Sequence, residues 1–179
     1  MRIVITGTPC TGKTTLAKAL SREMGVPLVN VKALEKRAAL RREGRETIVA
    51  VKRLEELLAK ATAHGKGFIA ESHLLCELAL PCDVCLVLRC NPALLQQRFK
   101  ARRYGLAKAD GNALAEMLDY CLLKAESNYK RVLQLDFTKP KTPKTVVKRL
   151  ESGKSDAVDF SRLLLSPRFK ALLDRQLKA

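Results

Sequence analysis

Residues 3–20, IVITGTPCTGKTTLAKAL, constrain this chain more than any other stretch. The β-branched residues at 3–6 favour a buried strand, and an amphipathic helix pattern follows the loop. Between them, GTPCTGKT matches the pattern G-x-x-x-x-G-K-[ST] in full. A strand, a glycine-bounded loop and a helix N-terminus together bind phosphate, because inward N–H groups and the helix dipole attract anions. The stretch therefore predicts a P-loop that binds a nucleoside triphosphate.

Two side chains of this loop carry chemistry that such a site needs. Lys13 is placed to reach the β- and γ-phosphates, and the Thr14 hydroxyl is placed to ligate Mg²⁺. Gly7 and Gly12 permit turns and close approach that a Cβ would obstruct. The alternative is a chance match in a Thr- and Gly-rich loop. We disfavour it because the strand and helix patterns both flank the motif.

The charge of the chain points to anionic partners. The sequence has 179 residues with 34 Lys and Arg against 18 Asp and Glu, so its formal net charge is +16 at pH 7. Such a field favours nucleotides, RNA or an acidic protein. Basic residues gather at 98–108 and again at 139–154. For each segment the alternative interpretation is a solvated face.

Composition and length predict one cytoplasmic domain. A hydrophobic content of 47% argues against disorder, and no apolar run approaches the roughly 20 residues that span a bilayer. The chain enters its first strand at once, so we expect no signal peptide and no membrane contact.

The six cysteines are then expected to be reduced. Cys82 and Cys85, with Cys76 nearby, suggest a metal site, but strand residues three apart face opposite sides, which favours buried structural thiols.

Alternating strand and helix patterns predict the fold. The first helix is expected to end at Gly25, and we expect further strands at 27–31, 68–70, 132–137 and in the near-continuous apolar run 82–90. Helices are expected at 32–43, where Gly44 breaks the pattern, at 46–63, at 92–103 with Asn91-Pro92 at its start, from 112 with Asn112 as its cap and Leu118 facing inward, and from 143 with Thr142-Pro143 at its start. Residues 105–111 are expected to form a polar, basic loop. This alternation predicts an α/β doubly wound, five-stranded parallel sheet flanked by helices, with its ligand at the carboxyl ends of the strands. Two short amphipathic helices are expected within 154–179. They dock either on the chain's own core or on a partner.

More candidate residues lie where the ligand is expected. Glu71 and His73 follow the strand at 68–70. A carboxylate there can hold Mg²⁺, directly or through water, and an imidazole can position a water or a phosphate. The alternative is a turn carboxylate and a hydrogen-bonded histidine. Arg98 and Arg102 are four apart on one helix, so both can point at one phosphate chain, and the basic segment that they begin is typical of a closing lid.

These motifs together resemble the adenylate kinase isoenzyme 6 family, in its archaeal form. Its members are small P-loop nucleoside monophosphate kinases that also act as ATPases in maturation of the small ribosomal subunit. The resemblance covers roughly residues 1–151. It rests on TGTPxTGKTTL at 6–16, VNV at 29–31, E-S-H at 71–73, VLRCNPxxLxxRxxxR at 87–102 and AE…LDYCL…A…NY at 115–129.

The resemblance implies a kinase domain at 1–153 and a C-terminal helical extension at 154–179. Within the domain it implies a monophosphate-binding region at 30–53 and a lid at 101–111. It also implies the roles of individual residues: Cys10, Gly12, Lys13, Thr14 and Thr15 surround the triphosphate, Arg102 is the lid arginine on ATP, and Glu71 and His73 form the acidic-x-His motif beside the γ-phosphate.

The sequence departs from the pattern of the family at three positions. Cys10 replaces the usual glycine, and we expect a cysteine to fit only if its φ is negative. Glu71 stands where aspartate is frequent, which shifts its contact with metal or water by one methylene. Arg103 stands where glycine is common before the lid tyrosine, Tyr104, and it stiffens the hinge and adds charge.

The expected reaction is phosphoryl transfer from ATP, with Mg²⁺, to AMP or another nucleoside monophosphate, giving two diphosphates. Because the acceptor is itself a phosphate, proton abstraction is hardly required, and catalysis is expected to be mainly positioning, lid closure and charge neutralisation by Lys13, Arg102 and Mg²⁺. The resemblance adds ATPase activity and a role in small-subunit and rRNA maturation. One alternative is an ATPase assembly factor that binds a small-subunit ribosomal protein, pre-rRNA or the 30S particle, with kinase activity incidental. Another is a kinase for a small hydroxylated metabolite, with His73 or Glu71 as the general base.

Overall fold

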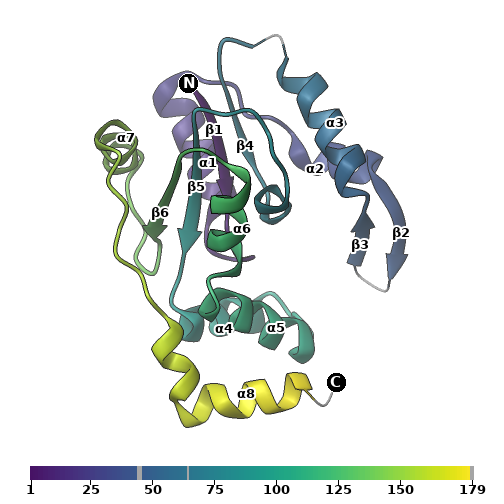
Figure 1. Ribbon diagram of the computed structural model, residues 1–179, viewed down its shortest axis with the longest axis vertical. Coiled ribbons are helices and arrows are strands. Elements are labelled where there is room, and N and C mark those ends of the chain that lie inside the picture. Colours follow the sequence, from purple (N-terminus) through teal and green to yellow (C-terminus); the bar gives the residue numbers. More distant parts are fainter. Residues whose placement is uncertain (44–45, 64, 178–179) are drawn as a thin grey trace.

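The fold is built on one parallel sheet (Figure 1). The computed structural model describes residues 1–43, 46–63 and 65–177. The sheet has the strand order β4-β1-β5-β6, and its neighbouring strands are parallel. Its strands are β1 (Arg2–Thr6), β4 (Phe68–Glu71), β5 (Val84–Arg89) and β6 (Val132–Asp136). The expected α/β class is confirmed.

Helices surround this sheet, and a small hairpin stands to one side of it (Figure 1). The α-helices are α1 (Lys13–Met24), α2 (Val31–Arg37), α3 (Val51–Thr62), α4 (Pro92–Ala101), α5 (Leu106–Met117), α6 (Tyr120–Asn128), α7 (Pro143–Ser152) and α8 (Pro167–Leu177). Two short 3₁₀ helices are η1 (His73–Glu77) and η2 (Ser161–Leu165). The hairpin consists of β2 (Ala39–Glu43) and β3 (Glu46–Val49), paired antiparallel.

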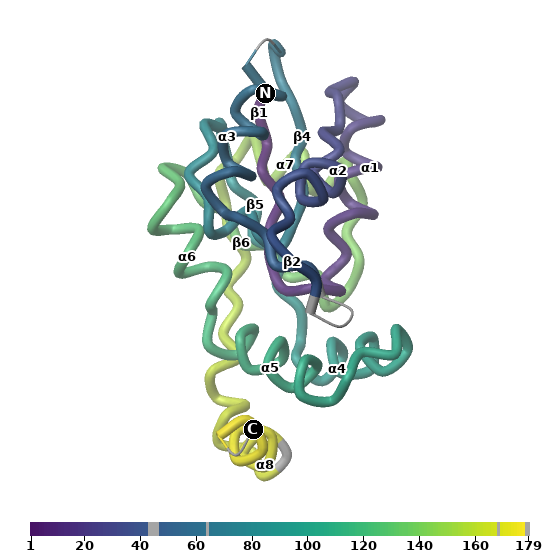
Figure 2. The backbone as a smooth tube through the Cα atoms, turned by 90° about the vertical axis from the view of Figure 1, so that its right-hand side faces the viewer, coloured from purple at the N-terminus to yellow at the C-terminus, as the bar shows by residue number. Residues whose placement is uncertain are grey.

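A hydrophobic cluster covers each face of the sheet. On one face α1 and α7 pack over Ile3 and Ile5. On the other face α2, α3, η1 and α6 pack over Val4, Ala70 and Cys85. Figure 2 shows α1 and α6 on opposite sides of the strands. Because β5 is covered on both faces, all six of its residues are buried, as its near-continuous apolar run predicts.

The place of β1 in the sheet positions the P-loop. β1 pairs with β4 on one side, where Ile3 faces Ile69, and with β5 on the other, where Ile3 faces Val84. The chain therefore builds one side of the sheet, crosses β1 and builds the other. Ligands of doubly wound sheets bind at such a switch point, outside the carboxyl ends of the strands. Residues 7–12 lie there, directly after β1.

The expected count of five strands is wrong, because residues 27–31 contribute only an isolated parallel bridge, Leu28 to Ile69. Two backbone hydrogen bonds of 2.8 Å remain, from the Val29 N–H to Ile69 and from the Ile69 N–H to Pro27. The segment stops there because the Asn30 side chain accepts from the N–H of Ala33 and caps α2. The chain turns into a helix before a strand can extend.

The helices expected at 32–43 and 46–63 are each only partly formed. α2 ends at Arg37, the hairpin takes residues 39–43 and 46–49, and α3 begins only at Val51. The N–H of Ala50 donates to the carbonyl of Ala38 at 2.9 Å and closes the base of the hairpin. The β-branched run at 47–49 favours a strand over the helix that its periodicity suggested. Gly44, the expected helix breaker, lies outside the described residues.

The lid region is more helical than expected, because α5 begins at Leu106 inside the segment predicted as a loop at 105–111. Asn112 is not the cap of a helix; it lies within α5, where its Nδ2 donates to the carbonyl of Lys108 at 2.7 Å. The predicted long helix from 112 is also divided. Asp119 has φ 56° and separates α5 from α6, which leaves Leu118 51% exposed instead of buried.

The C-terminal segment 154–177 packs on α5 (Figure 1). Phe169 and Leu172 of α8 form a small cluster with Ala113 and Met117. The buried carboxylate of Asp110 accepts from the half-exposed Arg175 at 2.7 Å. Before α8, Asp156 is hydrogen-bonded to the backbone of β6. Among the described helices, none is both long and apolar enough to cross a bilayer.

Candidate functional site

Three residues of the P-loop adopt left-handed backbone conformations: Gly7 at φ 130°, Cys10 at φ 70° and Gly12 at φ 108°. At Gly7 an added Cβ would lie 2.4 Å from the carbonyl oxygen of Leu88, so the loop closes against the end of β5. Gly12 is the N-cap residue of α1. The turns bring backbone N–H groups and the N-terminus of α1 together, which is the arrangement that binds phosphate.

The expectation for Cys10 is wrong, because its φ is positive. A left-handed conformation costs an L-residue about 1–2 kcal/mol, which explains why glycine is usual at this position. Two contacts hold the cysteine there. Its side chain packs half-buried against the cluster of Cys90, Leu95 and Phe99, and its carbonyl accepts from Arg98 Nη1 at 3.0 Å.

Lys13 is buried within the loop that it was expected to serve. Its Nζ donates to the carbonyl of Gly7 at 2.7 Å and to that of Thr8 at 2.9 Å. Burial lowers the pKa of this ammonium, although the nearby Glu71 carboxylate acts in the opposite direction. A phosphate oxygen is a stronger acceptor than a carbonyl, so a bound polyphosphate would draw Lys13 toward it.

Thr14 and Glu71, predicted as metal ligands from distant parts of the sequence, are brought together. The Thr14 hydroxyl donates to Glu71 Oε1 at 2.8 Å. Both line a pocket of about 420 Å³ that also includes Lys32. A hydroxyl and a carboxylate are hard oxygen donors, which is the set that Mg²⁺ prefers. The donor set therefore fits Mg²⁺.

His73 is the first residue of η1, just past the carboxyl end of β4. The Ser72 side chain caps this short helix by accepting from the N–H of Leu74, and it donates to a carboxylate oxygen of Glu35 on α2. The carbonyl of His73 accepts from the thiol of Cys76 at 3.2 Å. The backbone that carries the imidazole is therefore fixed from two sides.

The two arginines of α4 have different surroundings. Arg98 is half-buried and its guanidinium donates to the P-loop carbonyl of Cys10, as described above. Arg102 caps the end of α4, where its backbone N–H donates to Arg98 and Phe99 at 3.1 Å, and its side chain is exposed. Its expected role on ATP stays a prediction. Arg103 has φ 55°, a conformation that glycine adopts more readily.

A buried network behind the P-loop contains residues that no sequence motif pointed to. Glu116 of α5 accepts from Arg89 Nε at 2.9 Å, from the N–H of Cys90 at 3.0 Å and from the hydroxyl of Thr8. Burial disfavours the charge of Arg89, yet the carboxylates of Glu116 and Asp119 raise its pKa. The sequence signal that could have revealed this network is Arg89, a charged residue at the end of an otherwise apolar strand. The network fixes the P-loop to β5 and α5.

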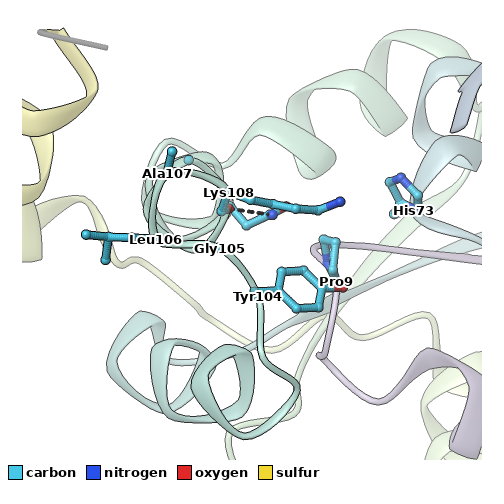
Figure 3. Close-up of a pocket in the computed structure, with 9 residues that line it drawn as sticks. Pro9, His73, Tyr104, Gly105, Leu106, Ala107 and Lys108 are labelled. Atoms are coloured by element: carbon cyan, nitrogen blue, oxygen red, sulfur yellow. Dashed lines mark hydrogen bonds between the residues drawn. The ribbon is translucent and has the colours of Figure 1, made fainter. Parts of the chain in front are cut away.

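Two larger pockets lie beside the P-loop. One, of about 770 Å³, is lined by Pro9, His73 and the start of α5 (Figure 3). The other, of about 640 Å³, lies between α2, the hairpin and η1 and includes Lys32, Lys36 and Arg42 in its wall. Both exceed the size needed for a small ligand. The expected monophosphate-binding region and lid supply much of these walls.

The cysteines are free, and burial raises the pKa of the Cys82 thiol to about 11 and that of Cys85 well above its usual range. Over residues 1–43, 46–63 and 65–177, no three His, Cys, Asp or Glu side chains gather to hold a metal ion. Cys85 is buried, as the sequence predicted, whereas Cys82 lies before β5 and is only half-buried.

Comparison with known proteins gives both sequence relatives and structural neighbours. The family described as "AAA domain" matches residues 3–119. A Thermococcus kodakarensis protein described as "Putative adenylate kinase" is 38% identical over 152 residues, which cover 84% of this chain and 83% of that protein.

Two solved structures share the fold. Deoxyadenosine kinase from M. mycoides matches with a TM-score of 0.57 and 14% identity, over 85% of this chain and 100% of that one. Shikimate kinase from Aquifex aeolicus matches with a TM-score of 0.56 and 18% identity, over 85% and 97%. At these identities the likeness shows the P-loop kinase fold alone. The two enzymes are named for different substrates, so the fold does not select the phosphoryl acceptor.

Proposed function

The chain belongs to the AAA domain family and to the archaeal family described as "Putative adenylate kinase", and from this premise we propose that it is a nucleoside monophosphate kinase. It transfers the γ-phosphoryl group of ATP to AMP and gives two ADP. The six free thiols fit the cytoplasm as its compartment.

One observation supports the proposal: a basic second pocket shares His73 and Lys108 with the pocket that Pro9 of the P-loop lines. Lys32, Lys36 and Arg42 line this second pocket with a single carboxylate, Glu35, among the described residues of its wall. A neutral hydroxylated metabolite has no need of three cations, whereas a nucleoside monophosphate carries a dianionic phosphate. The charge therefore favours a phosphate as the acceptor.

Each group of residues has its own role in the proposed reaction. The triphosphate of ATP is bound by the P-loop residues Cys10, Gly12, Lys13, Thr14 and Thr15. Mg²⁺ would be held by Thr14 and Glu71. The metal, when bound, neutralises charge on the β- and γ-phosphates. Lys13 moves from its backbone partners to the phosphates, Arg102 binds ATP from the lid side, and His73 orients the acceptor phosphate. Catalysis consists of positioning and charge neutralisation.

The deciding experiment is turnover of ATP by the purified protein with Mg²⁺, with and without AMP, with the products separated by chromatography. The proposal expects ADP at two per ATP consumed, and only when AMP is present. ADP and inorganic phosphate formed at the same rate without AMP would contradict it. Other nucleoside monophosphates in place of AMP then establish the base preference.

A second candidate is an ATPase that acts as an assembly factor on a small-subunit ribosomal protein or pre-rRNA. The observation that favours it is the net charge of +16 with the basic segment 139–154. Part of that segment is engaged within the chain, because Lys141 and Arg149 pair with Asp156 at 3.2 Å and 3.0 Å. Binding of rRNA that weakens steeply with salt, together with AMP-independent phosphate release, would support this candidate.

A further inference from the structure

Lys108 lies where two pockets of the candidate site meet. The pocket between the P-loop and α5 has Pro9, His73 and Lys108 in its wall. The pocket between α2 and the hairpin also has His73 and Lys108 in its wall. A side chain that lines both pockets can reach a ligand in either one. In the proposed kinase the phosphoryl group passes from one pocket to the other, so this boundary is where transfer takes place.

Local structure directs the side chain of Lys108 to that boundary. Lys108 belongs to the first turn of α5, and its carbonyl accepts from Asn112 Nδ2 at 2.7 Å. Its Nζ lies 5.3 Å from the centroid of the Tyr104 ring, within cation–π range. Figure 3 shows the side chain extending from α5 across the pocket toward His73. The ring thus restrains an otherwise exposed ammonium on the path between the two pockets.

Other cations of the site have different positions. Lys13 lies within the P-loop, Lys36 and Arg42 line the pocket between α2 and the hairpin, and Lys32 lines that pocket and the pocket of Thr14 and Glu71. In phosphoryl transfer, negative charge is spread over the equatorial oxygens of the group in transit, and these oxygens need a cation of their own. Lys108 supplies an ammonium group at the boundary that the two pockets share.

We propose, on the basis of the proposed kinase activity, that Lys108 is a catalytic residue that binds the phosphoryl group in transit. The bond from the γ-phosphorus to the β–γ bridging oxygen breaks, and ADP leaves with the electron pair. A phosphate oxygen of the acceptor forms the new bond to phosphorus. Lys108 neither gains nor loses a proton, since its role is electrostatic. A compact charge on a flexible stem suits a group that moves.

The test compares Lys108→Gln and Lys108→Arg with Lys100→Gln, in which an exposed lysine near the end of α4 is changed. We expect Lys108→Gln to lower the kcat of ATP–AMP transfer by roughly 10²–10³-fold. The KM of each nucleotide should stay within about threefold, because the interaction is made mainly in the transition state. Lys108→Arg should keep at least about a tenth of the activity, and Lys100→Gln should stay within about twofold.

Binding of diadenosine pentaphosphate gives a second readout, because its two adenosines and linking phosphates would occupy both pockets of the proposed kinase at once. Lys108→Gln should weaken this binding by about tenfold or more, while ATP and AMP each bind as they do to the wild type. Unchanged kcat in Lys108→Gln, or an equal loss in Lys100→Gln, overturns the role of Lys108 and leaves the proposed function standing. A wild-type protein that transfers nothing to any nucleoside monophosphate overturns both.

Discussion

At the scale of single residues, Lys13 is a positive charge that the P-loop holds in place before a ligand binds. The ammonium is buried and its pKa is lowered by that burial, yet two carbonyls of its own loop satisfy it. A phosphate that replaces those carbonyls gains a charge-assisted hydrogen bond in a place that excludes water. The site is therefore prepared for an anion before one arrives.

Lys13→Ala should abolish turnover while the fold stays intact. We expect kcat/KM for ATP to fall by at least roughly 10²–10³-fold, since a cation aimed at the transferred group is lost. The thermal midpoint should move by only a few degrees, about the shift that 1 kcal/mol gives in a chain of this size. Steady-state rates and calorimetry check this. Rates near those of the wild type would refute the site assignment.

Cys10 allows a second prediction at this scale, because its left-handed backbone suits glycine better. Cys10→Gly should leave turnover near the wild-type rate and change the free energy of unfolding by less than about 1 kcal/mol, as relief of strain offsets lost packing. Cys10→Val should be destabilised by more than about 1 kcal/mol, because β-branched residues tolerate this conformation poorly. Denaturant unfolding of both variants compares them. Equal stabilities would mean that the loop relaxes to a negative φ.

At the scale of elements, local signals predicted two helix starts and one helix end correctly. Asn91-Pro92 and Thr142-Pro143 begin α4 and α7, with the expected side-chain caps. Gly25 ends α1 in a left-handed conformation, as expected. Such signals lie within a few residues of the feature that they predict, and for that reason one sequence suffices to read them.

Elements defined by distant contacts could not be predicted in this way. The hairpin depends on the bond between Ala50 and Ala38, and the break at Asp119 accompanies its contact with Arg89, 30 residues away. The candidate site shows the same difference between local motifs and contacts of distant residues. Motifs pointed to Lys13, Thr14 and Glu71, whereas the contact of Glu116 with the P-loop required the packing of α5.

Asp156 fixes the C-terminal segment to β6 and gives a prediction for pH. Its carboxylate accepts from the N–H of Asp136 at 3.0 Å and pairs with Lys141 and Arg149. Burial acts to raise its pKa, but these hydrogen bonds and charges lower it below the ordinary value. A lowered pKa means stability that is present above the unfolded-state pKa and is lost as pH falls through the folded-state value.

Asp156→Asn should therefore lower the free energy of unfolding by about 1–3 kcal/mol at pH 7, and the difference from the wild type should shrink below about pH 4. Urea unfolding across that range measures it. Asp174→Asn, an exposed aspartate of α8, is the matched control and should show a much smaller effect. A difference that stays constant as the pH falls would show that charge is not the cause.

At the scale of the whole molecule, the hydrophobic clusters of buried residues differ in size. Two large clusters share the sheet, whereas the cluster of Ala113, Met117, Phe169 and Leu172 joins only α5 and the C-terminal segment. Small clusters at the end of a chain open more easily than the core. The segment 154–177 is therefore expected to undock from α5 before the sheet unfolds.

Leu172→Ala tests this order. Removing a fully buried leucine costs about 2–5 kcal/mol, and we expect the loss to appear as undocking of α8. Limited proteolysis should then cut between 157 and 166 much faster, while the main thermal transition changes little. Leu177→Ala, at a leucine that is 78% exposed, should behave as the wild type. A single lowered transition without early cleavage would mean that the segment unfolds together with the sheet.

The central position of β1 has a consequence for the way this chain acquires its structure during synthesis. β1 is the first strand to be made, but its partners begin only at Phe68 and Val84. An apolar strand must wait unpaired until most of the nucleotide-binding half has been translated, and pairing across such separations is slow. Gly7 also needs the end of β5 to pack against. The loop that is encoded first is thus among the last parts of the molecule to take shape.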